Sequence, residues 1–397
     1  MNDLFHQDIK KPALTGLFFL FFLWGALTCL NSIIIPHLEK LFVFKDASAF
    51  SFANAFFGSY LIMAIPSAWL IRFTGYKRSM ILGLLISALG TILFVFASKY
   101  VSYAVFITGF VILATGITLI QVVANTYVSI AGEKKFASSR LSLAQAINSL
   151  GYVLVLTTPF NPVSTGQESI VNIARNVQQP YLIIAILIVF VSLVYTRMQF
   201  PGNSLSLQKE SGEGFLRNRG LYIAAAAIFF YVGAELTVSR IIQFSFSDKY
   251  SSLLITVMLL CYWGGMMIGR FAGSAIFHRL SPAGVLLINS LACILLVATA
   301  GFLPQGLMIG FLIVLGLFNS IMFPVLFACG IHQSGHASCF HGAILIMAIS
   351  GGALIPALHD PIALHFGFRA SLLLLIVCYL IIAAAGYYLH RNSTVKE

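Results

Sequence analysis

The sequence is a series of long apolar runs separated by short polar breaks. A transmembrane helix needs about 20 mostly apolar residues to cross the hydrocarbon of a bilayer. With that length as a window, the pattern predicts twelve spans: 13–35, 48–73, 78–98, 101–131, 139–160, 180–200, 220–247, 252–279, 282–303, 306–333, 338–366 and 367–390. Several runs exceed the minimum, which is typical of tilted helices. The pattern therefore predicts an all-α integral membrane protein with twelve transmembrane helices.

The composition and the charge distribution agree with a membrane protein. Of the 397 residues, 59% are hydrophobic and 9% are charged, whereas a soluble chain of this length needs more charge to cover its surface. The net charge of +11 would also suit a nucleic-acid-binding protein. With the N-terminus placed in the cytoplasm, however, sixteen Lys and Arg residues, Arg270 among them, fall at cytoplasmic ends of spans and six at the opposite ends. This bias orients both termini to the cytoplasm, so we attribute the charge to topology and expect no nucleic-acid partner.

The chain divides into two halves that resemble each other weakly. Residues 201–219 form the longest polar stretch, rich in Gly, Ser and charge, which is typical of a linker between an N-terminal bundle (1–200) and a C-terminal bundle (220–397). Three matches occur in the same order in both halves: WGALTCLNSII (24–34) with VGAELTVSRII (232–242), LATGITLIQ (113–121) with IVLGLFNSI (313–321), and Gly151 with Gly351. Many secondary transporters are built from repeated halves with a solute site between them at mid-membrane.

Amide side chains recur inside the predicted spans: Asn31, Gln121, Asn125, Gln145, Asn148 and Asn319. An amide that faces lipid leaves donors and acceptors unpaired, so we expect these side chains to face the bundle interior. Each amide taken singly could instead bond a neighbouring helix. Five of them on three helices of one half favour a polar cavity of the kind that binds hydroxyl-rich solutes.

Glu235 and Arg240 lie inside the seventh predicted span. At 100° per residue they are about 140° apart around a helix, which disfavours a direct pair within that helix. Each then needs a partner on another helix, a water-filled cavity or a solute. One interpretation is a buried ion pair between helices. The functional interpretation is that Glu235 binds substrate or a proton and that Arg240 places a positive charge near the site.

Signals for enzyme chemistry are weak. The sequence contains no nucleotide-binding loop, nucleophile elbow or HExxH motif. His332, His336 and His341 cluster in IHQSGHASCFHG, but the adjacent Ser and Gly predict a solvated turn, and no carboxylate lies nearby in sequence to complete a metal site. We therefore expect neither an enzyme nor a bound metal or cofactor.

Six stretches carry a resemblance to a known family: QVVAN (121–125), SLAQAINSLG (142–151), FFYVGAE (229–235), YWGGMMIGRFAGS (262–274), GLFNSIMFP (316–324) and MAISGGALIP (347–356). Together they cover both halves, and the chain resembles the major facilitator superfamily, in particular its fucose–galactose–hexose symporter branch. The resemblance implies two six-helix bundles with a pseudo-two-fold repeat, alternating access, and a monomer in the bacterial inner membrane. It also assigns Arg72, Lys77 and Arg78 to a degenerate form of the family's short gating loop.

The resemblance has informative departures. Proton-coupled sugar carriers of the family have acids where Ser32 and Gln121 stand, so coupling through those two positions does not carry over. Gln145 and Asn148 match the family's sugar-site amides, and Glu235 matches an acid of the hexose-carrying members. Glu235 is therefore the coupling candidate for a proton, with sodium coupling or facilitated diffusion left open.

Two solute classes follow from these residues. The first is a neutral hexose or deoxyhexose, bound by the amides and moved by alternating access. The alternative is an anionic small molecule, such as a carboxylate metabolite, an acidic sugar or a siderophore, because Arg240 can bind a carboxylate bidentately. A transporter-like sensor is a third class, which the absence of a signalling domain in the linker disfavours.

Overall fold

The computed structural model describes residues 11–42, 52–158, 170–198, 218–246, 249–332 and 338–394, and within these ranges it is helical without strands. Its elements are α1 (Lys11–Leu41), α2 (Phe52–Tyr100), α3 (Tyr103–Ile130), η2 (Lys134–Phe136), α4 (Ala137–Leu156), α5 (Ile170–Arg197), α6 (Arg219–Phe244), α7 (Ser252–Ile276), α8 (Pro282–Phe302), α9 (Gln305–Asn319), α10 (Met322–His332), α11 (Cys339–Met347), η5 (Ala348–Ser350), α12 (Gly351–Phe366) and α13 (Phe368–Thr394). The prediction of an all-α membrane protein is confirmed.

These helices account for the twelve predicted spans. In the described ranges, ten helical segments are long and apolar enough to cross a membrane. One of them is α2, whose 49 residues contain two predicted spans and leave helical geometry at Gly75, with φ 80° and ψ 166°. The 20-residue α4 is the remaining span and is made more polar by the Ser, Gln and Asn side chains of its site-facing stretch. Two further spans are broken helices, one made of α9 and α10 and the other of α11, η5 and α12.

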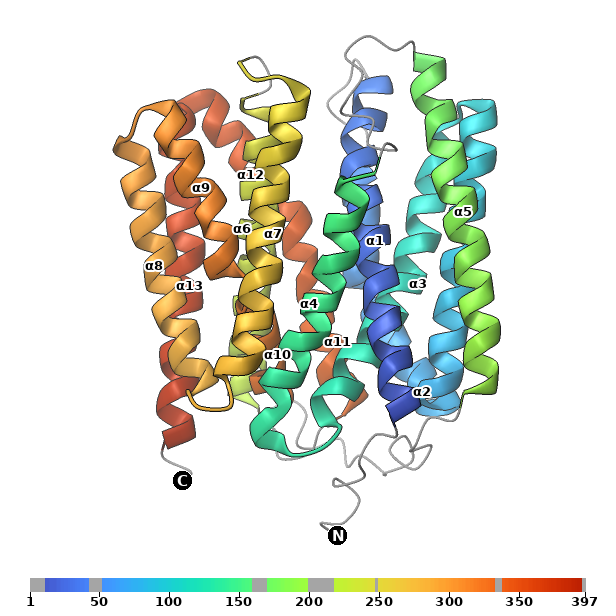
Figure 1. Ribbon diagram of the computed structural model, residues 1–397, viewed down its shortest axis with the longest axis horizontal. Coiled ribbons are helices and arrows are strands. Elements are labelled where there is room, and N and C mark those ends of the chain that lie inside the picture. Colours follow the sequence, from blue (N-terminus) through green and yellow to red (C-terminus); the bar gives the residue numbers. More distant parts are fainter. Residues whose placement is uncertain are drawn as a thin grey trace.

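The two halves of the chain form two bundles that lie side by side (Figure 1). Helices α1 to α5 form one bundle and α6 to α13 the other, and α1 begins and α13 ends at the same end of the molecule. We call that end the terminal side and the opposite end the distal side. The bundles meet where α4 packs against α7 and where α11 packs against α2 and α3. Most of the predicted linker, 201–219, lies outside the described residues, and Asn218 caps the first turn of α6 by accepting a hydrogen bond from the Leu221 amide.

Glycine contacts repeat between the halves. A Cβ atom on Gly151 of α4 would lie 2.1 Å from the carbonyl oxygen of Phe22 on α1. A Cβ atom on Gly351 of α12 would lie 2.0 Å from the carbonyl oxygen of Phe229 on α6. In each half, therefore, the backbone of the first helix crosses its partner helix at a residue that tolerates no side chain. The same packing at the aligned glycines supports the predicted pseudo-repeat.

The predicted gating loop is wound almost entirely into helix. Arg72, Lys77 and Arg78 lie within α2, around the single non-helical residue Gly75. Lys77 donates a hydrogen bond from Nζ to the carbonyl oxygen of Thr196 at 2.8 Å, near the end of α5. The structure therefore shows this segment as a kink on the terminal side that is tied to its own bundle.

Candidate functional site

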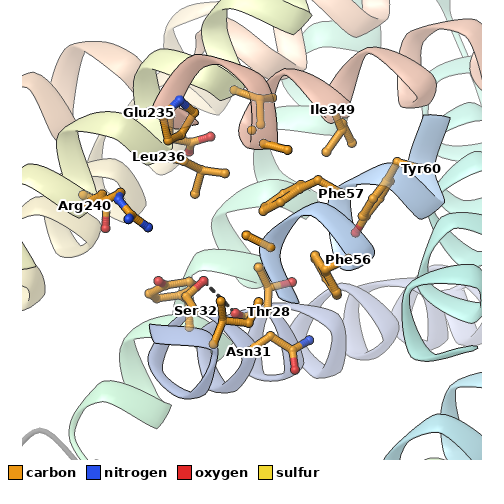
Figure 2. Close-up of a pocket in the computed structure, with 18 of the residues that line it drawn as sticks. Thr28, Asn31, Ser32, Phe56, Phe57, Tyr60, Glu235, Leu236, Arg240 and Ile349 are labelled. Atoms are coloured by element: carbon orange, nitrogen blue, oxygen red, sulfur yellow. Dashed lines mark hydrogen bonds between the residues drawn. The ribbon is translucent and has the colours of Figure 1, made fainter. Parts of the chain in front are cut away.

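A cavity of about 480 Å³ lies between the two bundles. Its lining extends from the middle of α1, α3, α4 and α7 to the distal ends of α2, α6 and α12. Six of the eight predicted site residues line it: Asn31, Gln121, Gln145, Asn148, Glu235 and Arg240. Figure 2 shows Glu235 and Arg240 on one side of this space, with Thr28, Asn31 and Ser32 of α1 on the other.

Two lining amides of the N-terminal bundle have hydrogen-bonding capacity to spare. Asn31 accepts a hydrogen bond at Oδ1 from the Tyr181 hydroxyl at 2.7 Å, and Gln121 donates from Nε2 to the Tyr60 hydroxyl at 2.9 Å. The opposite ends of these amides, Asn31 Nδ2 and Gln121 Oε1, have no hydrogen-bond partner in the described part of the chain. Both atoms are shielded from solvent in this structure, so one unpaired donor and one unpaired acceptor lie beside the cavity, although buried polar groups are normally paired.

Gln145 is held in place by Asn125, which is not among the residues that line the cavity. Its Nε2 donates to Asn125 Oδ1 at 3.1 Å, and Asn125 Nδ2 in turn donates to the Gln121 carbonyl oxygen at 3.0 Å. Asn125 is fully buried and is not among the lining residues, so in this structure it lies behind Gln145 and orients it, and its contact with a substrate stays a prediction. The neighbouring Asn148 lines the cavity while its Nδ2 donates to the Phe21 carbonyl oxygen at 2.9 Å on α1.

Asn319 is the second predicted site residue that lies outside the cavity. It sits at the end of α9, fully buried, where its Nδ2 donates to the Tyr262 hydroxyl at 3.3 Å. That hydroxyl donates to the backbone carbonyl oxygen of Glu235 at 3.0 Å. Asn319 therefore contacts α6 through Tyr262 in this structure, and its predicted role in binding a solute stays a prediction.

Glu235 lies deep in the cavity, and its partner is Arg270. Arg270 Nη2 lies 3.6 Å from Glu235 Oε1, and both side chains are buried. From the sequence, Arg270 was counted among the charges at the ends of spans, whereas the structure places it within α7, as in the predicted span 252–279, with its side chain buried against Glu235. The sequence carries a signal for this position, because Gly269 and Gly273 flank Arg270. In the structure both glycines pack closely against neighbouring helices.

Arg240 pairs with an acid that the sequence analysis missed. Its Nη2 and Nε lie 2.9 Å and 3.1 Å from Asp360 Oδ2, towards the distal ends of α6 and α12. The side chains are 39% and 46% exposed, so this pair is in contact with solvent. His359 Nδ1 lies 3.3 Å from Asp360 Oδ1, and Ser371 on α13 is hydrogen-bonded to the other ring nitrogen of His359. The sequence contains a signal for Asp360: it is an acid inside the eleventh predicted span, as Glu235 is an acid inside the seventh.

An aromatic pair joins the two bundles at the cavity. The rings of Tyr152 on α4 and Trp263 on α7 stack with centroids 4.1 Å apart, and Trp263 Nε1 donates to Ser239 Oγ at 3.3 Å. Both rings line the cavity. Flat aromatic faces beside amide groups suit a solute with an apolar ring face and a hydroxylated edge.

The terminal side of the cavity is closed by contacts between the bundles. Ser139 on α4 donates from Oγ to the Ser274 carbonyl oxygen at 2.5 Å, and the His332 ring lies 3.0 Å from the Ser129 carbonyl oxygen.

His336 lies outside the described residues, and the described ones contain no cluster of three metal-ligating side chains. A site between two helical bundles that extends to one side and is closed at the other is the arrangement of a secondary transporter.

Comparison with known proteins agrees with this class. The chain belongs to the Major Facilitator Superfamily, whose family model matches residues 13–356. It is 36% identical to a glucose/galactose transporter of Brucella abortus over 97% of both chains, and 27% identical to the L-fucose-proton symporter of Escherichia coli over 85% of this chain and 83% of the relative. Among solved structures, FucP in the outward conformation superimposes with a TM-score of 0.83 at 24% identity, covering 95% of this chain and 98% of that one.

Proposed function

We propose that this protein is a proton-coupled symporter that carries a neutral hexose of the glucose and galactose type into the cell. The observation that carries the proposal is the charge balance of the cavity. Among the described lining residues, both arginines are paired with acids, Arg240 with Asp360 and Arg270 with Glu235. What remains for a solute is a set of neutral amides and aromatic faces, and the names of the relatives point to the same class of sugar.

The transport cycle follows from the position of the cavity. The two rocking bodies are residues 1–200 and 220–397, joined by the linker 201–219, and a single chain supplies the whole site, as expected for a monomer. With both termini and the basic kink around Gly75 in the cytoplasm of a bacterial cell, the cavity opens to the outside. A sugar enters between α1 and α6, contacts both bundles, and is released when the contacts on the terminal side separate.

Glu235 is the proposed proton carrier. It is the buried acid among the described lining residues, whereas Asp360 is half exposed near the distal side. An acid at this depth needs either a counter-charge or a proton. The Arg270 guanidinium supplies the counter-charge at 3.6 Å, a distance longer than a direct hydrogen bond, so the carboxylate can accept a proton without first breaking a short contact.

The test is ligand-induced thermal stabilisation of the purified protein, followed by uptake into proteoliposomes. We expect D-galactose and D-glucose to raise the melting temperature and galacturonate and gluconate to leave it unchanged, because binding to the native state alone stabilises it. An inward pH gradient should then drive accumulation of the stabilising sugar. Stabilisation by the acidic sugars only would overturn the proposal and favour the anion alternative.

A further inference from the structure

Arg270 has partners on four sides. Its Nη2 faces the Glu235 carboxylate, and its Nε donates to the Ser320 carbonyl oxygen at 3.2 Å. Its Nη1 reaches the other bundle, where it donates to Ser149 Oγ at 2.5 Å and to the Gln145 carbonyl oxygen at 3.3 Å. One guanidinium group thus connects the cavity acid of α6 with α4 across the interface between the bundles.

The surroundings of Arg270 leave it little freedom. A Cβ atom on Gly269 would lie 2.2 Å from Ser320 Oγ, so α7 is pressed against the break between α9 and α10. The carbonyl group of Ser320 follows the last residue of α9, and carbonyl groups at a helix end need partners from outside the helix. Ser142 on α4 donates to the backbone oxygen of Arg270 at 2.8 Å. Side chain and backbone of Arg270 therefore both bind α4.

We infer that Arg270 transmits the charge state of Glu235 to the contact between α4 and α7 that closes the terminal side. The inference rests on the proposed function, namely alternating access with a proton on Glu235. While Glu235 is ionised, its charge compensates the guanidinium group and keeps it in the dry interface. When Glu235 takes up a proton, Arg270 becomes a buried charge with neutral partners only, which is a costly arrangement. The state in which α4 and α7 separate and water reaches Arg270 is then favoured.

The other groups around Glu235 leave Arg270 as its charged partner. The titratable side chains that face the carboxylate are Tyr231 on α6, Tyr262 on α7 and Tyr152 on α4, besides Arg270 itself. Phenol groups carry no charge at neutral pH and serve as hydrogen-bonding groups. Within the described structure, protonation of Glu235 therefore changes the electrostatic environment of one cation that is anchored in the opposite bundle.

The inference is tested by a double-mutant cycle, read by hydrogen exchange of the purified full-length protein at one pH and without sugar. Glu235→Gln mimics the protonated acid, and Arg270→Gln removes the cation whose environment the proton changes. We expect Glu235→Gln to raise exchange in the terminal-side part of α4, residues 137–149, by about tenfold, within the usual range of coupling between sites. In the Arg270→Gln background the same change should have less than about a twofold effect, because no buried cation is left for Glu235 to compensate. An undiminished tenfold response in that background would overturn the inference.

Two further variants show whether the effect is specific to Arg270. If Arg270→Gln does not give folded protein, Arg270→Met replaces it in the cycle, because it also removes the cation and keeps an unbranched side chain. A Glu235→Gln response in Arg270→Met equal to that in wild type then counts against the inference. The matched control is Arg140→Gln, since Arg140 donates to the carbonyl oxygens of Val128 and Ser129 within its own bundle. Its response to Glu235→Gln should stay tenfold, and loss of the response there would mean that any arginine near the interface has this effect. Because no sugar is present, a wrong sugar assignment leaves the result intact.

Discussion

Tyr152 on α4 and Trp263 on α7 stack face to face, with a centroid distance of 4.1 Å and an interplanar angle of 28°, and each ring comes from a different bundle. A sugar that rests on this pair touches both halves of the protein at once. Trp263 is further fixed by its hydrogen bond to Ser239 on α6. The aromatic pair is thus a place where binding of a solute and the relative position of the bundles are linked.

Trp263→Leu should weaken sugar binding by about five- to tenfold, because it removes an aromatic face worth roughly 0.5–1.5 kcal/mol beyond its buried area. The measurement is the sugar concentration that gives half-maximal thermal stabilisation. Trp69→Leu is the matched control, since Trp69 on α2 is 49% exposed and lies outside the cavity. Equal affinity losses in both variants would show that the effect of Trp263 is not local.

Glu235→Gln should uncouple transport from the proton gradient while sugar still exchanges across the membrane. The amide cannot take up and release a proton, but it keeps the shape of the side chain. In proteoliposomes, we expect accumulation driven by a pH gradient to disappear and counterflow of labelled sugar to persist. Glu133→Gln serves as the control, because Glu133 is an exposed acid that pairs with Lys135 at 2.9 Å outside the cavity. Gradient-driven accumulation that survives in Glu235→Gln would move the proton site to another group, with Asp360 as the next candidate.

Asp360→Asn should broaden the substrate range towards acidic sugars. Removing the acid leaves the Arg240 guanidinium uncompensated at the cavity, where it can pair with a carboxylate. We expect galacturonate to stabilise this variant and not the wild type. The stability of the unliganded protein should change by only about 0–1 kcal/mol, as is usual for a solvent-exposed pair. The double variant Arg240→Gln with Asp360→Asn should lack the new binding, and its persistence there would exclude Arg240 as the anion-binding group.

Asn125→Ala and Gln145→Ala should not act independently. Asn125 is fully buried and holds Gln145 through a hydrogen bond of 3.1 Å, so its effect on affinity passes through Gln145. We expect Gln145→Ala to weaken sugar binding by about tenfold, equivalent to one lost hydrogen bond of about 1.4 kcal/mol, and the double variant to bind no more weakly than that. Isothermal titration of the three variants measures this. Multiplicative losses would instead place Asn125 in contact with the sugar.

The fold could be predicted from the sequence because a bilayer restricts the choice of structures so strongly. Spans must be long, apolar and helical, and the aligned glycines Gly151 and Gly351 indicated the repeat that their shared packing supports. The break at Gly75 falls between the predicted spans 48–73 and 78–98, whereas its positive φ, with helix on both sides, is a detail that only the structure shows.

The site could be predicted only in part, for geometric reasons. Polar residues in apolar runs were correctly expected to gather, but their sequence positions do not tell which amide faces the cavity and which stands behind another. Asn125 and Asn319, for example, are buried beside Gln145 and Tyr262 and are not among the residues that line the cavity. Arg270 and Asp360 lie inside the predicted spans 252–279 and 338–366, but sequence positions do not show which partner a charge on one helix meets on another.

The two ion pairs of the cavity also determine which step of the cycle responds to the membrane potential. Each pair is neutral as a whole, so under the proposed function the empty carrier moves no net charge, whereas a proton on Glu235 gives the loaded carrier one positive charge. A potential of about 100 mV is worth roughly 2.3 kcal/mol for each charge that crosses, or about a fiftyfold concentration ratio. With the proposed orientation, we expect the membrane potential to favour inward movement of the loaded protein and to leave its empty return unaffected, so that sugar uptake is electrogenic only in its inward step.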